Sequence, residues 1–316
     1  MNIEDLKAKL NFILNDEIQK NIYIYVTSPK GLQLFNIVED DLNELMPIYV
    51  GLIKSLVLER DGLSLGDYSM TVARENMIYR YDLSLDRRTQ EMINMSRAGT
   101  EQNPDLFTVN NDSLEKINGF YVVIKSVENR VVFYKQILPI DKTYGRSSFF
   151  LGIKDNEMFE RKKDSLLRLV PGIQMLYVDD TIILVEMNKL EASLGLDAIL
   201  QKEAATTFRK IEERNIVLDI TKLKEVCDKP SMLKKLRHAL TVSKVKDLSN
   251  DNIIQFAKQQ NKLKFKFDEE RNKFNIDSQA AAKRFIKLLD DDYLFSKLTS
   301  TDYDSEQKGI LVEVLE

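Results

Sequence analysis

The chain of 316 residues has one cysteine, one histidine and no tryptophan. The single cysteine, Cys227, excludes an internal disulfide and any cysteine-rich zinc site, which agrees with a reducing compartment such as the cytoplasm. The single histidine, His238, leaves few routes to chemistry that depends on imidazole. A catalytic Ser or Cys would have to use it, and the sequence contains neither a glycine-rich phosphate loop nor a serine-centred elbow.

Long apolar runs are also missing. The best, IYVGLIKSLVL at residues 48–58, contains Lys54 and falls short of the roughly 18 residues that a membrane span needs. The opening MNIEDLKAKL is too polar for a secretory signal. Only 6 prolines and 11 glycines are present, without a repetitive tract, so nothing indicates a long disordered linker. We therefore expect a soluble globular protein, in which 43% hydrophobic residues supply the core.

The hydrophobic pattern changes along the chain. Up to about residue 188, amphipathic helices alternate with β-runs such as GFYVVIKSVENRVVFYKQILP, which predicts an antiparallel hairpin over 119–138. A helix starting near Asp40 contains Pro47, which we expect to kink or divide it. Beyond that point apolar residues recur at helical spacing. The sequence predicts an α+β fold: an N-terminal half with antiparallel strands, residues 1–188, and a mainly helical half with a short β-ribbon, residues 189–316.

An acidic pair, Asp179-Asp180, interrupts the apolar stretch GIQMLYVDDTIILVEM. Adjacent carboxylates on a tight hairpin can hold Mg²⁺ for nucleotidyl transfer, as in a reverse transcriptase. A polymerase also needs a third carboxylate, for which Asp82 is the nearest candidate, and a glycine-containing substrate segment that the interval lacks. We therefore interpret Asp179-Asp180 as a two-residue turn between strands.

One segment is strongly basic although the net charge is −4. KPSMLKKLRHALTVSKVK, residues 229–246, contains no Asp or Glu, and a helical projection separates its cations from its apolar residues. Such a face suits a phosphate backbone. A solvated surface, an acidic membrane or a partner protein would suit it too. With a weaker patch on a helix at 278–289, the candidate DNA-binding residues are Lys229, Lys234, Lys235, Arg237, His238, Lys244, Lys246, Lys283, Arg284 and Lys287.

A run of acids, Asp290-Asp291-Asp292, follows that second helix, and Asp302 and Asp304 are near it in sequence. Calcium-loop spacing is absent, and no lysine stands at a nuclease-like interval. We interpret the run as a helix exit with a solvated acidic turn. Accordingly we expect no metal and no cofactor.

Two stretches resemble a known family: DTIILVEMNKLEASLGLDAILQKEA and AAKRFIKLLDDDYLFSKLTSTDYDSEQK. Together with the order of the elements, they are similar to the KwaB family, the cytoplasmic components of the Kiwa antiphage defence system. The resemblance implies an effector that binds phage DNA and blocks phage replication and late transcription. It also implies self-association, as a homodimer or a higher homo-oligomer, and recruitment to the inner face of the cell membrane by the membrane-spanning partner KwaA.

The sequence leaves three functional hypotheses. The leading one is a non-enzymatic effector that binds DNA with little sequence specificity through the helices at 231–240 and 278–289. The second is a metal-dependent nuclease that uses Asp290 to Asp292 or Asp179-Asp180. The third is an adaptor, whose basic helix binds the membrane partner or acidic lipid and never contacts DNA.

Overall fold

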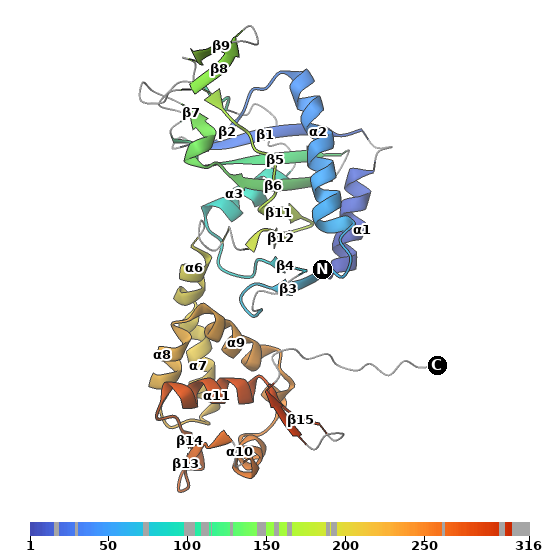
Figure 1. Cartoon of the computed structure of the whole chain (residues 1–316). Coiled ribbons are helices and arrows are strands. Elements are labelled where there is room, and N and C mark those ends of the chain that lie inside the picture. The colour runs from blue at the N-terminus through green and yellow to red at the C-terminus, as the bar shows by residue number, and fades with distance from the viewer. Residues whose placement is uncertain are drawn as a thin grey trace, which may run out of the picture. The chain divides into compact units, whose positions relative to one another are not determined.

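The computed structural model (Figure 1) divides the chain into two compact units. Unit 1 contains Met1–Gly66 and Glu75–Ser193, and unit 2 contains Asp67–Arg74 and Leu194–Glu316. The α+β fold is confirmed, because unit 1 is built on antiparallel strands and unit 2 is mainly helical. The structure describes residues 1–15, 19–28, 31–71, 76–97, 105–108, 114, 116–126, 129–143, 150–154, 158–162, 166–187, 190, 195–260, 263–296 and 301–304.

An eight-stranded sheet forms the centre of unit 1, in the order β2-β1-β5-β6-β11-β12-β4-β3. The pairings from β2 through β4 are all antiparallel. Two smaller strand pairs, β7 with β10 and β8 with β9, lie outside this sheet. The strands are β1 (Asn21–Ser28), β2 (Gly31–Leu34), β3 (Ser64–Asp67), β4 (Met77–Arg80), β5 (Gly119–Lys125), β6 (Arg130–Gln136), β7 (Lys142–Thr143), β8 (Phe150–Lys154), β9 (Met158–Lys162), β10 (Leu166–Leu167), β11 (Met175–Val178) and β12 (Thr181–Leu184).

Helices cover both faces of this sheet, which explains why β5 and β6 are almost continuously apolar. Helices α1 (Ile3–Leu14) and α2 (Glu39–Ile53) contact one side of the sheet. Successive side chains of a strand point to opposite faces. Phe120 and Val122 of β5 therefore join the core beneath α1 and α2, whereas Tyr121 points to α3 (Arg87–Ser96) on the other side.

Pro47 lies inside α2 without dividing it. The helix runs unbroken from Glu39 to Ile53 and continues into a π-helical turn, Lys54–Leu58. Proline leaves the carbonyl four residues earlier without its helical donor. That residue is Asn43, which is exposed, so water can satisfy its carbonyl. Of the two effects expected from the sequence, a kink or a division, the division was therefore wrong.

Both predicted hairpins form. In the β11–β12 hairpin, Val178 pairs directly with Thr181, so Asp179 and Asp180 make a two-residue turn. Their φ angles are 49° and 57°, the left-handed values that a type I′ hairpin turn requires. This confirms the turn interpretation of the acidic pair. In the β5–β6 hairpin, Ser126 and Asn129 face each other across a loop whose residues 127 and 128 lie outside the described residues.

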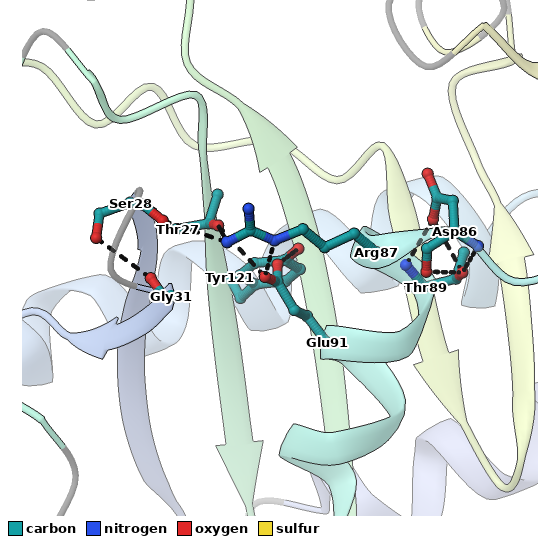
Figure 2. A network of polar contacts seen from close by, with 8 residues as sticks. All are labelled: Thr27, Ser28, Gly31, Asp86, Arg87, Thr89, Glu91 and Tyr121. Atoms are coloured by element: carbon teal, nitrogen blue, oxygen red, sulfur yellow. Dashed lines mark hydrogen bonds and ion pairs between the residues drawn. The ribbon is translucent and has the colours of Figure 1, made fainter.

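A polar network attaches α3 to the sheet (Figure 2). The Tyr121 hydroxyl donates to Glu91 Oε2 at 2.6 Å, and Arg87 Nε donates to Glu91 Oε1 at 2.8 Å. Arg87 also donates to the Thr27 hydroxyl and the Ser28 carbonyl of β1. The network thus joins α3 to two neighbouring strands, because Tyr121 lies on β5 and Thr27 on β1.

The helices of unit 2 pack together around a shared core. The α11 helix contacts α8 and α9, and its buried side includes Phe285, whose ring centroid lies 5.0 Å from that of Phe274. Cys227 is buried at the end of α8, and burial raises the pKa of its thiol to about 12, so it is a core residue, as predicted. The elements are α6 (Leu196–Lys202), α7 (Ala204–Arg214), α8 (Thr221–Cys227), α9 (Pro230–Thr241), η3 (Lys244–Asp247), α10 (Asn250–Gln259), β13 (Lys266–Asp268), β14 (Lys273–Asn275), α11 (Gln279–Leu289), β15 (Tyr293–Ser296) and β16 (Thr301–Asp304).

None of the described helices combines the length and the apolar character needed to cross a membrane.

We predict that Tyr121→Phe lowers the free energy of unfolding by about 1–3 kcal/mol, because the largely buried Glu91 carboxylate loses a hydrogen-bond donor. Urea denaturation measures this. Tyr81→Phe is the matched control, since the Tyr81 hydroxyl bonds the exposed Ser84 carbonyl, and it should change stability much less. Equal losses in the two variants would contradict the structural role of the Figure 2 network.

We also predict a loss of stability in alkali. Burial raises the pKa of Tyr49 and Tyr121 far above the usual range, and that of Tyr134 to about 12. Unfolded tyrosines ionise near pH 10, so the folded state holds these protons more tightly. The unfolding free energy should be unaffected below about pH 10 and then fall by up to ~1.4 kcal/mol per pH unit for each tyrosine. Urea titrations at several pH values test this, and a flat profile up to about pH 11.5 would contradict it.

Candidate nucleic-acid interface

Helix α9 carries the centre of the basic segment, and its start follows from the sequence. Pro230 occupies the first helical position, where its missing N–H costs nothing, and Lys229 precedes it as the N-cap. Apolar residues at helical spacing, Leu233, Leu236 and Ala239, are buried. The helix contacts α6, α7, α8, α11 and η3. A helix with neighbours on so many sides has little surface left for solvent.

Lys234 is not on a solvated face, contrary to the sequence-based expectation. Only 4% of this residue is exposed. Its ammonium lies 3.7 Å from the centroid of the buried Tyr68 ring, a cation–π contact. The Tyr68 hydroxyl in turn donates to Asp197 of α6 at 3.1 Å. Tyr68 belongs to the segment Asp67–Arg74, which is part of unit 2. The ring that contacts Lys234 therefore comes from a part of the chain that is distant in sequence.

The acidic turn, Asp290–Asp292, ends α11 in a Schellman motif. Asp291 adopts a left-handed φ of 60°. The Asp292 N–H donates to the Lys287 carbonyl and the Asp291 N–H to the Leu288 carbonyl, which satisfies the last carbonyls of the helix. This confirms a helix exit at that point.

Two carboxylates of the acidic turn pair with basic residues of α9. Asp292 is fully buried and forms an ion pair with Lys235, whose side chain is only 11% exposed. Asp290 Oδ1 lies 2.5 Å from Nδ1 of His238. The expectation of a solvated acidic turn is therefore wrong for Asp292, because a buried ammonium needs an opposite charge beside it. The pairs also show that the two predicted basic helices lie together, which the sequence could not establish.

The remaining candidate residues differ in accessibility. Arg237 Nη1 pairs with Glu203, the residue between α6 and α7, at 3.4 Å, and Arg284 and Lys287 are half-buried. Four candidates are exposed, and we call them the exposed lysines: Lys229, Lys244, Lys246 and Lys283. They lie at the start of α9, on η3 and on α11. Both η3 and α11 pack against α9.

Sequence reasoning missed the partners of these cations. Glu203 and Tyr68 have no local signal, because they come from other elements. Asp290 and Asp292 were noticed as an acidic run, but their pairing depends on α11 packing against α9, which no spacing reveals.

The acids considered for a nuclease are dispersed. Asp179 lies 3.5 Å from Lys9, and Asp180 accepts a hydrogen bond from Tyr177, both in unit 1. Among the residues that the structure describes, no group of three or more His, Cys, Asp or Glu side chains could hold a metal ion. The side chains of Asp302 and Asp304 lie outside the described part. The described geometry therefore gives the nuclease hypothesis no support.

Comparison with known proteins settles the family. The sequence profile described as "Kiwa protein KwaB-like" matches residues 114–299. The chain belongs to the KwaB family. A curated KwaB-family relative, Kiwa protein KwaB of Escherichia coli O55:H7 (strain RM12579 / EPEC), is 21% identical over 320 residues, which cover 99% of this chain and 100% of the relative. No solved structure matches. Membership of the KwaB family supports a role in antiphage defence.

We predict that Asp292→Asn lowers the free energy of unfolding by about 3–5 kcal/mol, because it leaves the buried Lys235 ammonium without its counter-charge. Urea denaturation measures the effect. The control is Glu269→Gln, which removes a carboxylate that is 74% exposed and pairs with Lys258. That change should cost less than about 1 kcal/mol. Two equally small changes would show that the Lys235–Asp292 pair does not stabilise the contact of α9 with α11.

Proposed function

We propose that the protein is an antiphage effector that binds DNA, largely without sequence specificity, through the exposed lysines. The observation that carries the proposal is their placement on α9 and on two elements that each contact it, η3 and α11. Several cations on a rigid framework displace counterions from DNA and so gain affinity that does not depend on the bases.

The structure changes which residues this proposal relies on. Lys234, Lys235, Arg237 and His238 hold unit 2 together through Tyr68, Asp292, Glu203 and Asp290. The exposed lysines are better placed to meet phosphate. Exposed Asp228 and Asp247 border the segment, and their charge should limit the surface to a few phosphates.

The family supports the rest of the proposal. By analogy with the KwaB family, we expect DNA binding to block phage replication and late transcription. We expect a cytoplasmic protein that self-associates as a homodimer or higher homo-oligomer. The membrane-spanning partner KwaA would recruit it to the inner face of the cell membrane.

We predict salt-sensitive binding of a labelled ~30-base-pair duplex, with a slope of log affinity against log salt near −3.5, as about four phosphate contacts give for duplex DNA. Fluorescence anisotropy across a salt series measures it. Changing the exposed lysines together to Gln should weaken binding at low salt and flatten the slope. Because none of the four is buried, the variant should keep its thermal stability.

The matched control changes four other exposed cations of unit 2 to Gln: Lys202, Arg209, Lys210 and Lys224. It alters net charge equally, so a comparable loss in both variants would contradict a local DNA-binding surface. Absence of duplex binding by the wild type, even at low salt, would overturn the proposal and favour the adaptor.

A further inference from the structure

A cavity of about 150 Å³ lies in unit 2 where η3, α10, the end of α11 and β15 meet. Apolar side chains form most of its lining, among them Val245 of η3 and Ile253 of α10. Phe256 of α10 also lines it while 40% exposed, and Leu248 is exposed beside it. The cavity is therefore apolar within and reachable from solvent through an aromatic rim.

The size and the lining of the cavity suit one aromatic ring. An apolar protein cavity of about this volume is able to hold benzene, so a six-membered ring fits. Tyr293 and Phe256 both contribute rings to the lining. Flat aromatic ligands gain from stacking on such side chains, and this gain does not depend on which base is bound.

Two polar side chains also line the cavity, Asn252 and Asp291. An amide offers one acceptor and two donors, and a carboxylate accepts hydrogen bonds from an exocyclic amine such as that of cytosine. The Schellman motif of α11 fixes the backbone of Asp291. The polar groups therefore match the edge of a nucleobase better than they match a purely apolar side chain.

Two exposed lysines flank one lining residue in sequence. Val245 lies between Lys244 and Lys246 on η3, and Lys246 Nζ also donates to the Thr241 carbonyl at 2.7 Å. A nucleotide whose base entered the cavity would carry its phosphates past η3, the element that bears these two lysines. Aromatic stacking beside cations is the arrangement by which proteins bind single-stranded nucleic acid.

We propose that this cavity binds one unpaired, pyrimidine-sized nucleobase of a single-stranded DNA segment. Phe256 stacks on the base, Asn252 and Asp291 bond its edge, and Lys244 and Lys246 contact the adjoining phosphates. The inference rests on the proposed DNA binding and adds a substrate class: DNA with unpaired bases binds more tightly than a blunt duplex of equal charge.

The absence of tryptophan from the chain allows a direct test. Phe256→Trp places a single fluorescent indole on the rim of the cavity, and Phe12→Trp places one on the exposed side of α1 in unit 1. We expect a short oligo-deoxycytidine to quench the Phe256→Trp emission and to leave that of Phe12→Trp unchanged. A blunt duplex should quench neither, although anisotropy shows it bound.

Two further variants measure the contribution to affinity. Phe256→Ala should weaken binding of the oligo-deoxycytidine roughly ten-fold or more, without altering blunt-duplex binding, whereas Phe12→Ala should alter neither. Asp291→Asn should reduce the preference for oligo-deoxycytidine over oligo-thymidine. Asparagine tolerates the left-handed backbone of residue 291, so this variant should keep its fold. Thermal unfolding confirms the folding of each variant.

The outcomes separate this inference from the proposed function. Unquenched Phe256→Trp emission with bound oligonucleotide, or equal oligonucleotide affinity of Phe256→Ala and wild type, overturns the base site and leaves duplex binding intact. If an apolar peptide quenches the Phe256→Trp emission and the oligonucleotide does not, the cavity binds a protein partner. That result also overturns the base site. Failure of the wild type to bind any DNA removes the proposed function and this inference together.

Discussion

The buried ion pair between Lys235 and Asp292 determines how unit 2 can be built. A mostly buried ammonium is costly unless it is compensated, and for Lys235 the opposite charge comes from the turn that ends α11. The pair fixes where α11 stops relative to α9. The Schellman motif and the His238–Asp290 contact follow from the same placement. The cavity beside the turn depends on it too, because Asp291 stands between the two paired carboxylates.

Much of the fold could be predicted because periodicity reports local burial. The hairpin turn at Asp179-Asp180, the core position of Cys227 and the exit of α11 at Asp290 all depend on neighbours in sequence. Pro47 does not divide α2, because a missing N–H affects one carbonyl only, and that carbonyl belongs to an exposed residue.

The candidate site was less predictable, because charge on a helix does not reveal whether the charge is already paired. Lys234 and Lys244 look alike in sequence, yet one is covered by Tyr68 and the other is exposed. The covering residue lies more than a hundred positions away. The signal that could have helped was the acidic run after α11, because its charge is opposite to that of the basic residues of α9.

The segment Asp67–Arg74 gives the chain an unusual connectivity, since it leaves unit 1 and returns to it. The backbone therefore passes from one unit to the other three times instead of once. A fragment cut near residue 194 would lose Tyr68 and leave Lys234 and Asp197 without the ring and hydroxyl that they contact. The helical half therefore cannot be separated from the rest of this chain at a single junction without losing these contacts.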